Sequence, residues 1–365
     1  MGFSCGIVGL PNVGKSTLFN ALTNSQKAKA SNYAFCTIEP NKAIVDVPDE
    51  RLEKIAKIES SKNIIPTQLT FIDIAGLVKG ASKGEGLGNK FLSHIKEADL
   101  ILHVIRCFEN SDIEHVEKSL DPIRDMKIIE DELILSDLIS AEQQLKKIKK
   151  EIHKAKENIE KIPLLEKIIK NLTSEESFTS LNFNNDEEKI VKTFNLISTK
   201  PKIFVCNLSE KENLENNNYI NLIIDNINDK KALVISISAE IESQISQLEK
   251  ENEKKEFLDS LGWKNSGLDR VINSSYIKLD LLTFFTAGEQ ETRAWTVKKN
   301  SAAPDAASII HTDFEKGFIR AETISYEDYI KYSGLKGAKE NGKIRQEGKE
   351  YLIKDGDIVH FLFNI

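Results

Sequence analysis

The chain has 365 residues, of which 50 are Lys or Arg and 57 are Asp or Glu, so its formal net charge at pH 7 is −7. This length allows two or three domains, and 40% hydrophobic with 29% charged residues is typical of globular proteins. The acidic balance excludes a surface that is basic throughout, so any nucleic-acid contact must come from a local patch. The sequence contains neither an apolar run of about 18 residues nor a basic start followed by an apolar stretch. We therefore expect a cytoplasmic protein that makes no membrane contact.

The first motif reads GLPNVGKST from Gly9 to Thr17, between an apolar run at 5–8 and an apolar-periodic stretch at 18–22. Its spacing and its strand–loop–helix context fit a phosphate-binding loop. The glycines let backbone N–H groups surround a β-phosphate, and the following helix adds its positive end. A lysine here reaches the β- and γ-phosphate oxygens, and the next hydroxyl holds Mg²⁺. The residues expected to contact nucleotide are Asn12, Val13, Gly14, Lys15, Ser16 and Thr17.

A second motif follows the apolar strand predicted at 69–72 and reads Asp73, Ile74, Ala75, Gly76. An aspartate at the carboxyl end of such a strand commonly orders Mg²⁺ through its waters. The backbone N–H of Gly76 is placed to sense a γ-phosphate, and a glycine-rich loop follows it to residue 88. Upstream, Thr37 offers a second hydroxyl. The sequence therefore predicts a magnesium site made of Ser16, Thr37 and, through water, Asp73.

Base recognition is predicted from the residues after the strand at 202–206, which read Asn207, Leu208, Ser209, Glu210. Guanine-specific relatives carry Asn-Lys-x-Asp here, and the aspartate accepts two hydrogen bonds from guanine. The longer glutamate should misplace its carboxylate, and losing such a pairing costs several kcal/mol of preference. Asn207 is still able to serve an adenine edge. The sequence thus favours ATP over GTP, or at least a relaxed choice between them, with base contacts from Asn207, Leu208, Glu210, Ser238, Ala239 and Glu240.

Strand-like runs alternate with helical patterns before residue 128 and after residue 201, which predicts a mostly parallel sheet covered on both faces. Between them, apolar residues from Leu138 to Ile162 follow alternating steps of three and four, a heptad seam. We interpret 128–201 as an inserted antiparallel helical hairpin whose long arm carries this seam. From Gln143 to Leu172 there are nine lysines and four glutamates, and 9 − 4 gives +5. This arm is either a solvated coiled-coil face or a contact for RNA or an acidic partner.

These motifs, together with Phe35 to Asn41 and the tail from Asp313 to Arg320, resemble the YchF/Obg-like ATPase family of translation-factor-related GTPases. The resemblance covers essentially the whole chain. It implies an α/β fold: a Ras-like P-loop NTPase domain (1–127 and 202–277), an inserted antiparallel coiled-coil hairpin (128–201) and a carboxyl-terminal β-grasp TGS domain (278–365). It also implies a preference for ATP and association with the ribosome, or its large subunit, in translation regulation or a stress response. The hairpin and TGS domain would contact rRNA or tRNA.

Leu77 stands where Ras-like enzymes carry the glutamine that orients the attacking water. A leucine cannot hold this water, so intrinsic turnover is expected to be slow. His115, on the loop after the strand at 100–105, is the candidate catalytic group, and the alternative is a surface histidine. Asn12 is a further candidate, because in related potassium-stimulated enzymes an asparagine at this place helps to coordinate K⁺.

The sequence is best read as a Mg²⁺-dependent ATP-hydrolysing switch. Two alternatives remain open: a GTPase that acts in ribosome assembly, and a nucleotide-sensing adaptor whose purpose is protein binding.

Overall fold

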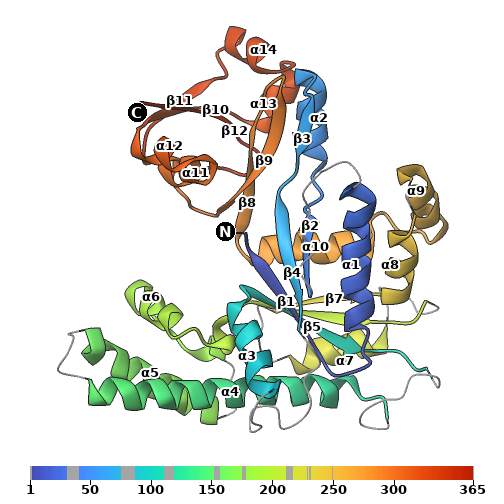
Figure 1. The fold of residues 1–365 in the computed structure, drawn as a ribbon, viewed down its shortest axis with the longest axis vertical. Coiled ribbons are helices and arrows are strands. Elements are labelled where there is room, and N and C mark those ends of the chain that lie inside the picture. The colour runs from blue at the N-terminus through green and yellow to red at the C-terminus, as the bar shows by residue number, and fades with distance from the viewer. Residues whose placement is uncertain are drawn as a thin grey trace. The chain divides into compact units, whose positions relative to one another are not determined.

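The computed structural model describes residues 2–30, 41–74, 87–110, 119–151, 157–174, 178–210, 217–227, 229, 232–248 and 250–364. The chain divides into two compact units (Figure 1). Unit 1 contains Met1–Val45 and Thr70–Arg270, and unit 2 contains Asp46–Leu69 and Val271–Ile365. In the described part of the chain, no helix is both long enough and apolar enough to cross a membrane.

Unit 1 is built on a six-stranded sheet in the order β2-β4-β1-β5-β6-β7. The strands are β1 (Ser4–Val8), β2 (Lys42–Asp46), β4 (Gln68–Asp73), β5 (Leu100–Arg106), β6 (Lys202–Asn207) and β7 (Leu233–Ile237). From β4 to β7 every neighbouring pair is parallel. The predicted α/β class is confirmed, and the carboxyl ends of the strands share one edge, where such sheets bind ligands.

Among the described residues, the helices that accompany this sheet are α1 (Lys15–Ala30), α3 (Leu87–Glu97), α4 (Pro122–Lys150), α7 (Asn218–Asn226), α8 (Ala239–Ser246) and α9 (Glu251–Ser260). Helix α10 (Gly267–Lys278) begins in unit 1 and continues into unit 2. Helix α1 packs against α8, while the first half of α4 packs on β5. Met126 of α4 enters a buried cluster with Ile105, Phe204 and Ile223. The long helix therefore starts as part of the α/β layer.

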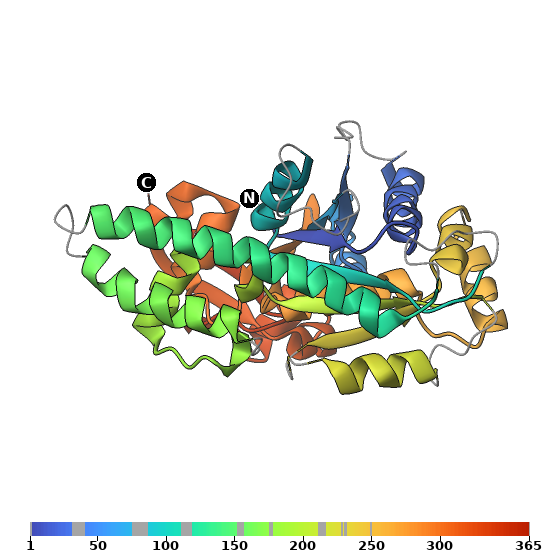
Figure 2. The same cartoon turned by 90° about the horizontal axis from the view of Figure 1, so that it is seen from below.

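The helical hairpin consists of α4 and α5 (Glu157–Thr173), which lie side by side in both ribbon views (Figure 2). Helix α6 (Asn185–Thr193) and two short 3₁₀ turns, Phe178–Ser180 and Ile197–Thr199, complete it. Ala141 of α4 packs with Leu165 and Ile168 of α5.

The prediction of one continuous apolar seam from Leu138 to Ile162 on a single helical arm is wrong. Helix α4 ends at Lys150, and residues on the two sides of the connection belong to two antiparallel helices. Ile159 is 58% exposed and does not join the seam; Ile152 and Ala155 lie outside the described residues. The three-four spacing stays in phase across the connection, so periodicity alone could not locate the turn.

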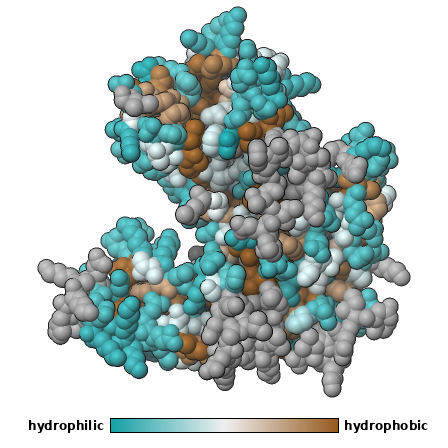
Figure 3. All heavy atoms as spheres, viewed as in Figure 1, coloured by the Kyte–Doolittle hydropathy of each residue, from teal (hydrophilic) through white to brown (hydrophobic). Residues whose placement is uncertain are grey.

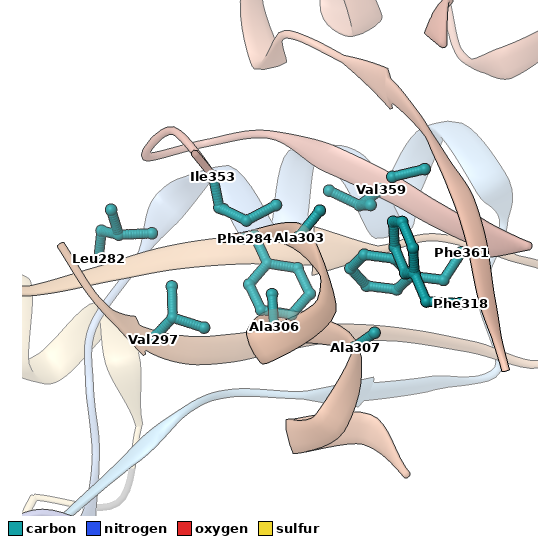
Figure 4. Close-up of a cluster of buried hydrophobic side chains, with 11 residues drawn as sticks. Leu282, Phe284, Val297, Ala303, Ala306, Ala307, Phe318, Ile353, Val359 and Phe361 are labelled. Atoms are coloured by element: carbon teal, nitrogen blue, oxygen red, sulfur yellow. The ribbon is translucent and has the colours of Figure 1, made fainter. Parts of the chain in front are cut away.

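Unit 2 contains a second six-stranded sheet, which is mixed and has the order β11-β10-β12-β8-β9-β3. Its strands are β3 (Asn63–Ile65), β8 (Leu281–Thr286), β9 (Glu291–Lys298), β10 (Phe318–Ile324), β11 (Arg345–Glu347) and β12 (Ile358–Phe363). Helices α11 (Ala303–Ile310) and α12 (Thr312–Lys316) cover a core that includes Phe284, Phe318 and Phe361 (Figure 4). A second core joins Phe285 to helices α2 (Glu50–Glu59), α13 (Tyr326–Lys331) and α14 (Leu335–Glu340).

Residues 46–69 belong to unit 2, whereas the domain boundaries expected from the sequence placed them in the nucleotide domain. Strand β3 pairs in parallel with β9, with Asn63 opposite Glu291. Leu52 and Ile55 of α2 are buried beside Phe285. These contacts join segments more than 200 residues apart in the chain, so local pattern carried no sign of them.

Candidate nucleotide site

The loop between β1 and α1 has the sharp backbone turns of a phosphate cradle. Gly14 has φ +100°, and a Cβ there would lie 2.2 Å from Nδ2 of Asn207. At Gly9, which has φ +155°, a Cβ would lie 2.5 Å from the carbonyl oxygen of Val104. Asn12 also has a positive φ, 60°. Both glycines are therefore required by close approach, and the loop leads directly into the amino end of α1.

Lys15 crosses this loop. It is only 6% exposed, and its Nζ donates a hydrogen bond to the carbonyl oxygen of Leu10. Burial lowers the pKa of Lys15 to about 8, while the charge of Asp73 acts in the opposite direction. The lysine thus carries a poorly solvated charge in a place where an anion would stabilise it.

Asp73, at the end of β4, pairs in register with Ile7 of β1 and so lies next to the loop. Its Oδ1 is buried and has no hydrogen-bond partner among the described residues. Burial raises the pKa of Asp73, and Lys15 opposes this change. The unpartnered carboxylate oxygen of Asp73 and the hydroxyl of Ser16, an exposed residue, are oxygen donors of the kind that Mg²⁺ and its waters take. The other predicted residues, Thr37, Gly76 and His115, lie outside the described residues.

Asn207 fastens two walls of the site to each other. Its Nδ2 donates to the carbonyl oxygen of Val13 at 2.9 Å, and its Oδ1 accepts from the backbone N–H of Ala239 at 2.9 Å. The side chain is 4% exposed. Asn207 therefore joins the phosphate loop to the start of α8; it also lines the cavity described next, and its adenine-edge contact stays a prediction.

A cavity of 590 Å³ opens at this edge of the sheet. Its lining includes Asn12, Gly14, Lys15, Ser16, Thr17, Asn207, Leu208, Glu210, Ala239 and Glu240, all predicted from sequence, as well as Phe108, Glu109, Asn110 and Ser209. Among the described residues, two that were predicted to contact nucleotide do not line it, and neither does the predicted magnesium residue Asp73. Val13 is 2% exposed and contributes its carbonyl oxygen to Asn207, and Ser238 is fully buried.

The wall formed by Phe108 to Asn110 was missed by sequence reasoning. It follows β5 and is held by Arg106, which is 3% exposed. An arginine that ends an otherwise apolar strand was the one signal that could have indicated it.

Glu210 lies at the part of the cavity expected to receive the base. Its Oε1 accepts a hydrogen bond from Nε2 of Gln244 on α8, at 2.8 Å. The N–H of Leu208 is also engaged, with the carbonyl oxygen of Ile237 at 2.8 Å. The carboxylate is thus tied to a helix, unlike a free aspartate that pairs with guanine.

Two family models match the chain: "50S ribosome-binding GTPase" over residues 4–171, and YchF-GTPase_C, described as "Protein of unknown function (DUF933)", over residues 281–364. Among curated relatives, "Ribosome-binding ATPase YchF" of Haemophilus influenzae is 50% identical over 366 residues, and that of Bacillus subtilis is 50% identical over 368 residues. Each alignment covers 100% of both chains.

A solved structure titled "Structure of the Schizosaccharomyces pombe YchF GTPase" matches 99% of this chain and 98% of its own. Its TM-score is 0.88 at 39% identity. Identity of this order over full length, together with the shared fold and the phosphate loop, establishes that the chain belongs to the YchF family.

Proposed function

We propose that this protein is a Mg²⁺-dependent ATPase that associates with the ribosome and acts as a slow switch in the cytoplasm. The observation that carries this proposal is the cavity in which Lys15 and the phosphate loop face a modified base pocket at Leu208 and Glu210. The printed names of the full-length relatives support ATP hydrolysis and ribosome binding. Regulation of translation or a stress response is the process that suits such a switch.

In the proposed mechanism, the loop amides and Lys15 bind the phosphates, and Lys15 gives up its bond to Leu10 for the β- and γ-oxygens. Ser16, Thr37 and Asp73 would hold Mg²⁺, which supplies positive charge against the phosphates. The amide of Gly76 senses the γ-phosphate. Because Leu77 cannot hold the attacking water, His115, or K⁺ held near Asn12, assists hydrolysis.

ATP is proposed as the preferred nucleotide. Leu208 replaces the lysine of guanine-specific relatives, and Glu210 is bonded to Gln244. Wild-type protein should bind a non-hydrolysable ATP analogue with Mg²⁺ at least about tenfold more tightly than the GTP analogue. The double variant Leu208→Lys, Glu210→Asp should narrow this ratio. Gln247→Ala, at an exposed glutamine that follows α8 and does not line the cavity, is the matched control. Tighter GTP binding by the wild type would favour the assembly GTPase instead.

The hairpin and unit 2 are proposed to contact ribosomal or transfer RNA. Lys146, Lys149 and Lys150 line a surface groove on α4 with Leu145 and Glu142, and the hairpin face seen in Figure 3 is mostly hydrophilic. By the family resemblance, residues 278–365 form the TGS module, and the structure adds residues 46–69 to the same compact unit. Lysines in such a row bind phosphates in a salt-dependent way.

Reversal of Lys146, Lys147, Lys149 and Lys150 to glutamate should weaken co-sedimentation with ribosomes and reduce its salt dependence. Reversal of four lysines elsewhere in unit 1, at positions 250, 254, 255 and 264, should have a much smaller effect. If both quadruple variants lose ribosome co-sedimentation equally, the basic face of the hairpin is a solvated surface and not a ribosome contact.

A further inference from the structure

Arg106, the last residue of β5, holds the cavity wall that follows it. Its Nε donates to the carbonyl oxygen of Phe108 and its Nη2 to that of Asn110, each at 3.1 Å. The guanidinium carbon lies 4.6 Å from the centre of the Phe108 ring. A planar fork on two carbonyls with a ring stacked beside it fixes both position and orientation, which a lysine cannot do.

The buried carboxylate of Asp125, on the long helix α4, acts electrostatically on this arginine. Burial lowers the pKa of Arg106, and the charge of Asp125, in the first turn of α4, opposes that change. Asp125 is 2% exposed, and its Oδ1 also accepts hydrogen bonds from Nε and Nη2 of Arg124, at 3.1 and 2.9 Å. Arg124 in turn donates to the hydroxyl and the carbonyl oxygen of Ser119. Asp125, Arg124 and Ser119 are thus bonded to one another at the start of α4.

The carboxyl ends of the neighbouring strands β5 and β6 each hold a different part of the cavity in place. Arg106 is in register with Asn207 on β6. Asn207 fixes the phosphate loop and α8, whereas Arg106 fixes Phe108 and Asn110. The hydrogen bonds of Asn207 cannot replace those of Arg106, because the two side chains bond to different segments of the chain.

We propose that Arg106 is a positioning residue for the nucleotide: it sets the wall Phe108–Asn110 against the bound ATP. This inference rests on the proposed function of the cavity.

The test measures the dissociation constant of fluorescent ATP with Mg²⁺ in a double-mutant cycle. Arg106→Gln should weaken binding roughly tenfold, the cost of losing charge-assisted hydrogen bonds, and Arg106→Lys should weaken it less. In a Phe108→Ala background, the same Arg106→Gln change should add less than about twofold, since the wall it positions has lost its ring.

Lys200→Gln is the matched control. Lys200 is another partly buried cation, and it donates to two backbone carbonyls, of Lys96 at 2.9 Å and of Ala98 at 2.6 Å, but it does not line the cavity. Its loss should lower the melting temperature and leave ATP affinity unchanged. Additive effects of Arg106→Gln and Phe108→Ala, or unchanged affinity in Arg106→Gln, would overturn the positioning role while the nucleotide site stands. A wild-type protein that binds no ATP would refute the proposed function, and this inference with it.

Discussion

At the scale of single residues, the lysine of the phosphate loop has a measurable consequence. Burial brings the pKa of Lys15 down from 10.5 to about 8, so near pH 8 about half of the free protein carries a neutral Lys15. Bound phosphates favour the charged form and raise this pKa again. Nucleotide binding at pH 8 should therefore take up to about half a proton per site.

Calorimetry in two buffers with different ionisation enthalpies measures this proton uptake directly. Uptake should fade at pH 6.5, where Lys15 is already charged. Binding of adenosine, which has no phosphate, is the control and should take up no proton. Uptake that is equal at pH 6.5 and pH 8 would contradict the lowered pKa.

The residues of the phosphate site could be predicted from the sequence because motif spacing fixes them locally: Lys15, Ser16 and Asp73 each follow or end a predicted strand. The fastening role of Asn207 and the contribution of Phe108 could not be predicted. Both depend on which strand ends meet at the sheet edge, and the meeting of β5 with β6 is a tertiary contact. Sequence motifs identify the residues that contact a ligand more readily than the residues that hold those contacts in position.

At the scale of elements, a buried glutamate caps a helix. Glu242 of α8 is fully buried, and its carboxylate accepts from the N–H of Gly267 at 2.7 Å and of Leu268 at 3.1 Å, at the start of α10. Burial raises the pKa of Glu242 to about 7; the two backbone hydrogen bonds and Arg270 lower it, and Asp269 raises it. Desolvation exceeds the capping bonds, so the neutral form is favoured in the folded state.

The sign of the resulting pH dependence follows from this raised pKa. The protonated carboxyl stabilises the fold fully below pH 4.5, and this contribution is lost as pH rises through about 7. The loss amounts to about 3 kcal/mol of unfolding free energy. Glu242→Gln cannot ionise, so unfolding of unit 1 should depend less on pH between 5 and 7.

Urea unfolding at pH 5, 6 and 7 measures this slope. Of the two tryptophans in the chain, Trp263 belongs to unit 1 and Trp295 to unit 2, so a Trp295→Phe background makes fluorescence report on unit 1. Glu240→Gln, at an exposed position on the same helix, is the control and should keep the wild-type slope. Parallel curves for wild type and Glu242→Gln would rule out titration of this group.

The elements themselves were mostly within reach of the sequence, because apolar periodicity separates buried strands from amphipathic helices. The turn of the hairpin was not. Its two arms carry the same three-four spacing, and the choice between one long arm and two shorter ones rests on the packing of Leu165 and Ile168 against Ala141. Packing between two helices across a turn does not change the spacing of apolar residues along the sequence, so the sequence does not reveal it.

At the scale of the whole molecule, unit 2 needs two distant pieces of chain. A fragment of residues 271–365 lacks Leu52 and Ile55, which are buried against Phe285 and Tyr329, and the ion pair of Arg51 with Asp355 at 2.6 Å. Burial of two large aliphatic side chains contributes about 3–6 kcal/mol, comparable to the whole stability of a small domain. The fragment alone should therefore fail to unfold cooperatively.

Near-UV circular dichroism of Trp295 during heating measures the cooperativity of the fragment's unfolding. A fusion of residues 46–69 to 271–365 through a flexible linker should recover a cooperative transition, and the same fusion with Ile55→Asp should not. If the bare fragment melts as sharply as the fusion, segment 46–69 is dispensable to unit 2.

The split composition of unit 2 also has a consequence in time. Residues 46–69 leave the ribosome about 200 residues before Val271, which at ~5–20 residues per second is a delay of ~10–40 s. Throughout this interval, Leu52, Ile55 and Ile58 lack the partners that later bury them. Unit 1 can close its sheet in the meantime, since β2 and β4, at the two ends of the waiting segment, are neighbours there. During its own synthesis, the protein therefore passes through a form in which the nucleotide fold is finished while the apolar face of the amphipathic helix α2 has not yet met its strands.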